Sequence, residues 1–368
     1  MSKLQKLAAP SLAAFLVLAL TVPAPVVAFS LEGKKVTFIV PYKEGGGTDT
    51  MARIFQPFLQ KYLPGNPTVI VLNQPGGAGS KASNKFQREG RKDGTMIIGV
   101  SSSALTAFMV QAKKVRYDVL SWKPVILIPR GNVFYSNPKL SGIVGHGKDI
   151  AGDIKKLQKT EGLANGTKNP VDAGLRGTLA YSLLGINHST TFGLSTSKQR
   201  KAYHRGELSL NYDAPGPYNK KVKKYEKKGT VVPYMSFGYL DKDGNIKRDL
   251  MFPNLPTVEE AYVAAHGNKP SGPKWQAFKN FLAIGVNASK AIALPAGTPD
   301  NVVAVYDKAM RKIDADPAFR KIAEKRFGKL PRSFGAEAKQ TLMNATTMKP
   351  KVRTWMKKWI KQRYDVKI

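Results

Sequence analysis

The chain contains no cysteine among its 368 residues. This absence excludes disulfides, thiolate metal ligands, thiol nucleophiles and a lipid-modified cysteine anchor. Histidine is also scarce, and its four copies lack the spacing of a metal motif such as HExxH, so we predict no metal and no cofactor. We predict no catalytic residue either. The sequence has no GxSxG nucleophile elbow, and its SxxK at 195–198 lacks the accompanying SDN and KTG elements.

Acidic residues are few, with 25 Asp and Glu against 59 Lys and Arg, which gives a formal net charge of +34. Such a charge attracts anions and is one footprint of nucleic-acid binding. The basic residues are spread along the chain, however, for example as KKVKKYEKK at 220–228 and RKIAEKR at 320–326, and no nucleic-acid motif accompanies them. We therefore expect a solvated basic surface and no nucleic-acid partner. A basic polyanion-binding surface protein stays open as an alternative.

Long apolar runs are absent except near the start, where LAAFLVLAL follows Lys3 and Lys6. This run is much shorter than the roughly 20 residues that cross a bilayer. Small residues, Val26 and Ala28, follow at the positions that a signal peptidase reads. We predict a signal peptide at 1–28, cleavage after Ala28, a mature chain beginning at Phe29 and a location in the periplasm.

The first third of the mature chain alternates between strands and helices. Short β-branched runs at 36–40, 68–72 and 95–100 are typical of strands buried on both faces, and helix-like segments at 48–63 and 79–90 separate them. This order predicts a doubly wound α/β sheet. Right-handed crossovers then place the carboxyl ends of all three strands at one edge.

Polar, glycine-rich segments follow the three strands: PYKEGGGTDT, NQPGGAGS and SSSALT. Ligands of open α/β sheets bind at this edge. Glycine allows close approach of the backbone, and a helix start offers unpaired N–H groups, so the segments predict a cradle for a small anion such as a carboxylate. They lack the GK[ST] ending and the GxGxxG spacing of nucleotide sites. Asp49, in the first helical turn, indicates a water-mediated contact or a ligand with a cationic group.

The remaining chain predicts a second lobe and a return to the first. A strand at 122–128 leads into a loop-rich region, followed by a helix at 171–184, strands around 231–240 and a turn at 241–245. Helices are then predicted at 301–313, 318–328 and 352–364. The last one is basic and amphipathic, and we expect it to dock on a lobe rather than on a membrane. A length of 368 residues fits two lobes.

Five segments, in order VPYKEGGGTDTMAR, VLNQPGGAGS, DGTMIIG, FPNLPTVEEAY and LPAGTP, resemble the TctC or Bug family, the extracytoplasmic receptors of tripartite tricarboxylate transporters. The resemblance implies an α/β, two-lobed type 2 periplasmic binding protein fold, each lobe a mostly parallel sheet flanked by helices. Lobe 1 would comprise 29–130 and 250–368, and lobe 2 would comprise 131–249. It further implies a monomeric, non-enzymatic receptor that closes on a small organic carboxylate and delivers it to membrane permease subunits.

The resemblance also implies that backbone amides and waters hold the carboxylate. The implied ligand-binding residues are Tyr42, Gly45, Gly46, Gly47, Thr48, Asp49, Gly76, Gly77, Ala78, Gly79, Ser101, Ser102 and Ser103, with Asn165, Gly166 and Thr167 in the second-lobe loop at 164–170. The chain departs from the family at 195–218, where STSKQRKAYHRGELSLNYDAPGPY replaces a VPYKG stretch, so the ligand's identity is not inherited. An exported α/β enzyme acting on an organic acid stays open as an alternative.

Overall fold

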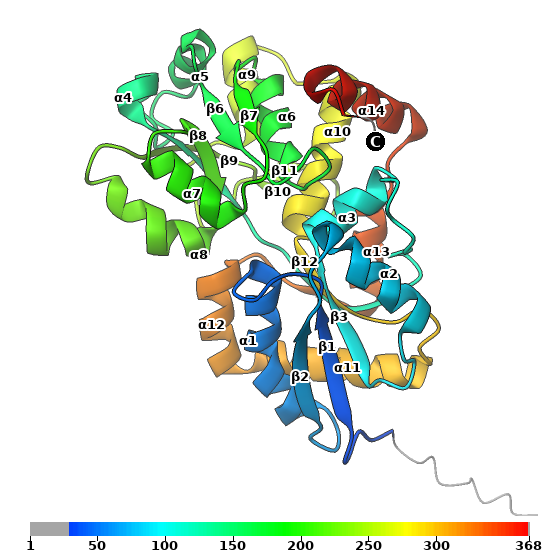
Figure 1. Ribbon diagram of the computed structural model, residues 1–368. Coiled ribbons are helices and arrows are strands. Elements are labelled where there is room, and N and C mark those ends of the chain that lie inside the picture. Colours follow the sequence, from blue (N-terminus) through cyan, green and yellow to red (C-terminus); the bar gives the residue numbers. More distant parts are fainter. Residues whose placement is uncertain (1–28, 367–368) are drawn as a thin grey trace, which may run out of the picture.

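The computed structural model describes residues 29–366, and the predicted signal peptide lies outside the described residues. The described chain forms two lobes, one below the other in Figure 1, each built around its own β-sheet. Among residues 29–366, no helix combines the length and apolarity needed to cross a membrane.

Lobe 1 contains a six-stranded sheet of mixed direction. Its strand order is β13 (Ser333–Phe334), β4 (Lys123–Ile128), β12 (Lys290–Leu294), β3 (Met96–Ser101), β1 (Lys35–Val40) and β2 (Thr68–Asn73). As the alternation predicted, β1 pairs in parallel with both β2 and β3. The return strand β12 runs antiparallel between β3 and β4, so its first residue, Lys290, lies opposite Ser101 and Ile128. Four of the six strands therefore share one direction.

Helices cover both faces of this sheet, because its strands are buried on both sides. One buried cluster joins the face of Phe38 and Ile126 to α1 (Gly47–Tyr62), α11 (Asp300–Ala315) and α12 (Pro317–Phe327). A second cluster joins the face of Ile98 and Leu127 to α2 (Ser80–Glu89), α3 (Ser102–Met109) and α13 (Gly335–Thr346). The predicted helices at 48–63, 79–90, 301–313 and 318–328 are thus confirmed in type and place.

Lobe 2 is built around the three-stranded sheet β8 (Leu210–Asp213), β5 (Val133–Ser136) and β9 (Val232–Ser236). Two further strands, β6 (Ala164–Gly166) and β7 (Ser189–Thr191), pair in parallel, and the N–H of Ser209 joins β6 to the start of β8 by donating to the carbonyl of Ala164 at 3.0 Å. The surrounding segments are α4 (Pro138–Ser141), α5 (Ile150–Lys159), α6 (Leu175–Leu183), α7 (Thr196–His204), α8 (Pro215–Pro217), η2 (Tyr218–Val222) and η3 (Lys223–Tyr225). A hairpin of β10 (Tyr239–Leu240) and β11 (Ile246–Lys247) encloses the predicted turn.

The fold class is confirmed, with one difference in lobe 2: β5 pairs antiparallel with both β8 and β9, which share a direction. The reason is the entry point of the chain. The first strand after a crossing starts at the edge facing the other lobe, whereas β1, β2, β3 and β4 of lobe 1 and β8 and β9 of lobe 2 end at that edge. β5 enters lobe 2 in this way, and β12 enters lobe 1 in the same way.

The two lobes share buried apolar contacts through the segment that returns the chain to lobe 1. This segment consists of α10 (Gly272–Leu282) and η4 (Ala283–Asn287), and its cluster reaches both Leu127 in lobe 1 and Phe134 in lobe 2. Beyond residue 249, α9 (Val258–His266) packs on α5, and α14 (Pro350–Tyr364) packs on α10. As predicted, the final helix docks on the protein, with Val352, Met356 and Ile360 buried. The lobe boundaries remain a prediction.

Candidate functional site

The three glycine- and serine-rich segments meet at the edge of lobe 1 that faces lobe 2 (Figure 1). Because β1, β2 and β3 are parallel, with Val40 opposite Asn73, their carboxyl ends lie side by side. Each end leads into a helix: α1 after β1, the 3-10 turn η1 (Gly77–Gly79) and α2 after β2, and α3 after β3. Three helix starts thus point toward the same place. The sequence predicted the first two of these helices, and α3 was not predicted.

The first segment leaves the start of α1 without a side-chain cap at Gly46. Asp49, in its first turn, is buried and accepts hydrogen bonds from the Gly45 N–H at 2.9 Å, the Arg53 Nε at 3.1 Å and the Asn73 Nδ2 at 3.0 Å. Burial raises the pKa of Asp49, but the bonds from Arg53, Gly45 and Asn73 outweigh it and hold the pKa below its usual range. Asp49 therefore fastens the first segment to the end of β2.

The second segment has four consecutive residues with positive φ: Gly76 at 146°, Gly77 at 55°, Ala78 at 55° and Gly79 at 101°. Only glycine adopts such angles without strain. The Tyr42 hydroxyl donates to the carbonyl of Ala78 at 3.1 Å, and a Cβ on Gly79 would lie 2.5 Å from that hydroxyl. Glycine at 79 is thus required for this close approach.

Tyr42 joins the three segments, because its hydroxyl also forms a hydrogen bond with Ser101 Oγ at the end of β3. Desolvation raises the pKa of Tyr42, so the phenol is neutral at physiological pH. Ser101 caps α3 by accepting from the Ala104 N–H at 3.4 Å. The Tyr42 hydroxyl therefore links the second segment to the end of β3, at Ala78 and Ser101.

A carboxylate of lobe 2, that of Asp172, contacts the start of α3 in lobe 1 directly. Asp172 accepts from Ser103 Oγ at 2.6 Å, the Gly174 N–H at 2.8 Å and Thr167 Oγ1 at 3.4 Å, and Lys168 Nζ lies 3.9 Å away. The predicted residues Ser103 and Thr167 thus donate hydrogen bonds to the two oxygens of one carboxylate. The turn at Asp172 also explains why α6 begins at Leu175 instead of at residue 171, where the sequence predicted a helix.

The other lobe 2 residues of the predicted site lie in the packed interior. Asn165 is buried and donates to Thr178 Oγ1 at 3.3 Å. A Cβ on Gly166 would lie 3.0 Å from side-chain atoms of both Leu194 and Leu208. Ligand contact by Asn165 and Gly166 remains a prediction, and the described contacts of both residues belong to the lobe's own packing.

Two cations that were not predicted from the sequence, Lys290 and Arg130, lie next to Gly47 and Thr48 at the start of α1. Lys290 is 8% exposed, and its Nζ donates to Thr48 Oγ1 at 2.8 Å. A Cβ on Gly47 would lie 3.6 Å from an Arg130 Nη1 and 4.0 Å from the Lys290 Cε. The Arg130 Nε is buried and has no hydrogen-bond partner among the described residues. Positive charge thus lies next to an uncapped helix start.

Burial and neighbouring cations lower the pKa of both Lys290 and Arg130. Burial, followed by the charges of Arg130 and Lys168, lowers the pKa of Lys290 well below its usual value. Burial and the nearby Arg176 lower the pKa of Arg130 to about 10. Among the described side chains, Asp172 is the carboxylate that raises the pKa of Lys290. The site therefore favours an additional negative charge.

One of these cations, Arg130, could have been predicted from the sequence. Arg130 comes two residues after the predicted strand 122–128, so the same edge argument applies to it. Lys290 gave no such signal, because it begins its strand. Only the antiparallel direction of β12 brings a first residue to this edge.

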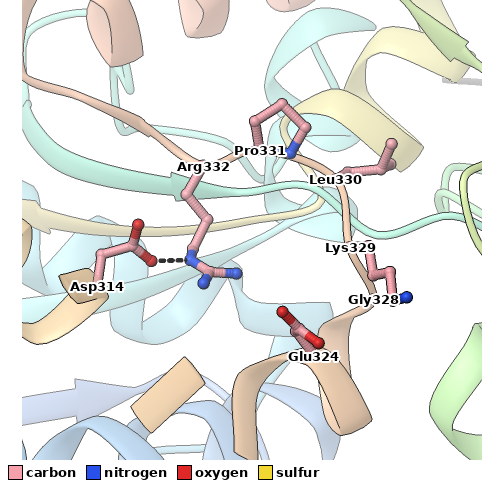
Figure 2. A pocket seen from close by; sticks show the side chains of 7 residues that line it. All are labelled: Asp314, Glu324, Gly328, Lys329, Leu330, Pro331 and Arg332. Atoms are coloured by element: carbon pink, nitrogen blue, oxygen red, sulfur yellow. Dashed lines mark hydrogen bonds and ion pairs between the residues drawn. The ribbon is translucent and has the colours of Figure 1, made fainter. Parts of the chain in front are cut away.

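A pocket of about 170 Å³ lies elsewhere in lobe 1 and is shown in Figure 2. Arg332 extends toward Asp314 and forms an ion pair with it, while Glu324 lies across the pocket (Figure 2). None of the predicted site residues lines it. Its lining includes the carboxylates of Asp314 and Glu324 as well as the cations Lys329 and Arg332. Within residues 29–366, no three His, Asp or Glu side chains are grouped to hold a metal ion.

The chain matches no family model. It is similar to Protein BugT of Bordetella pertussis, with 32% identity over 123 residues, which is 32% of this chain and 36% of BugT. The match thus spans about a third of that curated relative.

Similarity to solved structures extends over most of the chain. The periplasmic binding protein BugD is 20% identical with a TM-score of 0.61, covering 88% of this chain and 97% of BugD. A TctC solute binding protein from Polaromonas is 15% identical with a TM-score of 0.62, covering 88% and 98%. MatC from Rhodopseudomonas palustris, with bound malate, is 17% identical with a TM-score of 0.58, covering 89% and 98%. The resemblance to the TctC/Bug family is confirmed, and the chain has the fold of these periplasmic binding proteins.

Proposed function

We propose that this protein is a periplasmic solute receptor that binds a small organic carboxylate between its lobes and delivers it to the membrane permease subunits of a tripartite tricarboxylate-type transporter. Relatives in the same fold support the ligand class, since one carries malate and another, from R. palustris, carries adipate. The receptor would be exported with cleavage after Ala28, and it would act as a monomer without turning over its ligand.

The observation that carries the proposal is Lys290. Burying an ammonium group costs several kcal/mol unless an opposite charge compensates it. The described hydrogen bond of Lys290 Nζ goes to the neutral hydroxyl of Thr48. A ligand carboxylate placed between Lys290, Arg130 and the start of α1 would supply the missing negative charge. The partial positive charge of the helix start would add to the attraction.

Binding would close the two lobes on the ligand. Lobe 1 would hold the carboxylate through backbone N–H groups at residues 45–49 and 76–79, together with Tyr42 and residues 101–103. Lobe 2 would complete the site from the side of Thr167 and Asp172, where Asp172 already contacts lobe 1 by accepting a hydrogen bond from Ser103. Contacts with both lobes favour the closed state, because only that state makes all of them.

A screen of mono-, di- and tricarboxylates by thermal shift would identify the ligand. A ligand at 100 times its dissociation constant adds about 2.7 kcal/mol to the stability of the native state. The same samples, examined by mass spectrometry after incubation, should return the ligand unchanged. If the ligand is converted to a product, the receptor proposal is wrong and the protein is an exported enzyme.

The variant Lys290→Met tests the site itself. Methionine retains an unbranched apolar stem of similar length and removes the buried charge, so we expect the ligand-free protein to unfold at a higher temperature. Carboxylate affinity should fall at least tenfold by calorimetry, because the charge that attracts the ligand is gone. Lys85→Met, at an exposed lysine on α2, is the matched control and should change neither quantity. Unchanged affinity in Lys290→Met would contradict the proposed site.

A further inference from the structure

Exposed lysines gather on one surface of lobe 2. This surface, the lobe 2 basic patch, consists of α7 and the segment 218–230, and its exposed lysines are Lys198, Lys201, Lys220, Lys221, Lys223, Lys224, Lys227 and Lys228. We propose that the lobe 2 basic patch holds the receptor against the anionic phospholipid headgroups of a membrane surface. The proposal goes beyond carboxylate binding and uses none of the residues of the interlobe site.

Packing brings the two segments of the patch together. The His204 ring at the end of α7 stacks on the Tyr225 ring, with centroids 4.0 Å apart. The Tyr203 hydroxyl donates to the carbonyl of Thr230 at 3.0 Å. Lys224 Nζ and Lys228 Nζ lie 5.2 Å and 5.5 Å from the centre of the Tyr225 ring. These contacts hold the two segments against each other, beside the labels α7 and α8 in Figure 1.

Neighbouring acidic groups do little to neutralise the patch. Glu226 accepts a hydrogen bond from the Tyr218 hydroxyl at 2.7 Å and is half-buried, and Glu207 is paired with Arg205. The positive field is felt locally, because burial and then the charges of Arg200 and Lys224 lower the pKa of His204. The charges of the eight lysines are therefore available to attract an anionic surface that approaches the patch.

The composition of the patch favours a lipid surface over a protein partner. Protein interfaces depend on apolar and aromatic anchors at their centre. The exposed large apolar side chains of the described chain lie elsewhere, at Ile70, Leu72, Leu140, Val144, Leu250, Val263, Ile322 and Met343. Lysine carries a point charge on a flexible stem, without the planar fork that arginine uses for shaped recognition. Clusters of four to eight basic residues are typical of binding to anionic membranes.

The test compares two triple variants that have the same net charge. Lys220→Gln, Lys224→Gln and Lys228→Gln together remove three charges from the patch. Lys308→Gln, Lys312→Gln and Lys321→Gln together remove three charges from exposed positions on α11 and α12 of lobe 1. Protein purified from the periplasmic fraction is sedimented with vesicles of equal parts phosphatidylglycerol and phosphatidylcholine, or of phosphatidylcholine alone, at low and physiological salt.

We expect the wild type to bind the phosphatidylglycerol vesicles, to release them as salt rises and to ignore phosphatidylcholine. Each basic residue near an anionic surface strengthens binding about fivefold, so the patch variant should bind about 100-fold more weakly. The lobe 1 variant should bind within a few-fold of the wild type, and neither variant should alter carboxylate affinity. An equal loss in both variants would show that net charge alone attracts the protein, and would overturn the patch. If the patch binds soluble polyglutamate but the protein does not bind the vesicles, the membrane proposal is wrong and the partner is an acidic protein.

Discussion

At the scale of single residues, Asp249 sets a measurable pH dependence. Its carboxylate lies against Gly131, where the chain crosses between lobes, and one of its oxygens is buried without a partner among the described residues. Burial raises the pKa of Asp249 to about 6, above its value in the unfolded chain. The native state therefore binds this proton more tightly, so the stabilisation is present at low pH and is lost as pH rises through 6.

Replacing this carboxyl group should remove that contribution. The free energy of unfolding of the wild type, relative to Asp249→Asn, should be about 2 kcal/mol greater at pH 4.5 than at pH 7.5. Urea unfolding at the two pH values measures the difference. The other carboxyl groups are the same in both proteins and cancel, so identical pH profiles would mean that Asp249 titrates normally.

Gly47 brings the backbone of α1 close to the buried cations Arg130 and Lys290. Its helical position accepts alanine, because the closest atoms to an added Cβ are 3.6 Å away, at ordinary contact distance. We expect Gly47→Ala to fold with unchanged stability or slightly higher stability, since alanine favours helix. Its methyl group occupies the space in front of Arg130 and Lys290, so carboxylate affinity should fall tenfold or more by calorimetry. Thr50→Ala, one turn into the same helix, should leave the affinity unchanged.

At the scale of elements, α9 begins with a complete capping box. Thr257 Oγ1 accepts from the Glu260 N–H at 3.1 Å, and Glu260 Oε2 accepts from the Thr257 N–H at 2.8 Å. We expect Thr257→Ala to lower the free energy of unfolding by about 1 kcal/mol, the usual loss of an N-cap. Ser271, before α10, forms no side-chain cap, so Ser271→Ala should cost only a few tenths of that. Equal midpoints of urea unfolding would contradict the assignment.

At the scale of the whole molecule, Ser103 and Asp172 connect the lobes. A hydrogen bond to a charged group contributes about 1.5–3 kcal/mol, which corresponds to at least a tenfold change in an equilibrium constant. We expect Ser103→Ala to shift the ligand-free protein toward an open arrangement. Its radius of gyration, from small-angle scattering, should rise without ligand and return to the wild-type value at saturation. A ligand-free radius that matches the wild type would show that this bond does not hold the lobes together.

Local pattern was enough to predict much of the fold and part of the site. The apolar β-branched runs gave the strands, and the alternation with helices gave the parallel pairing of β1 with β2 and β3. The shared edge at which the three strands end followed from that pairing, whereas α3, which starts there, was not predicted. The helix predicted at 171–184 starts late, because Asn169 and Asp172 bind the backbone of the preceding turn through their side chains. Competition between such side-chain hydrogen bonds and the hydrogen bonds of a helix is hard to predict from hydrophobic periodicity alone.

The sequence by itself determined which residues form strands, which segments are rich in glycine, and that positive charge dominates, since these properties depend on near neighbours in the chain. Tertiary structure decided which distant residues meet. Lys290 stands beside Thr48 only because β12 returns antiparallel between β3 and β4. Asp172 reaches Ser103 only because a second lobe faces the first. The physical reason is that strand direction and lobe contact depend on burial over the whole molecule, which no local stretch of sequence encodes.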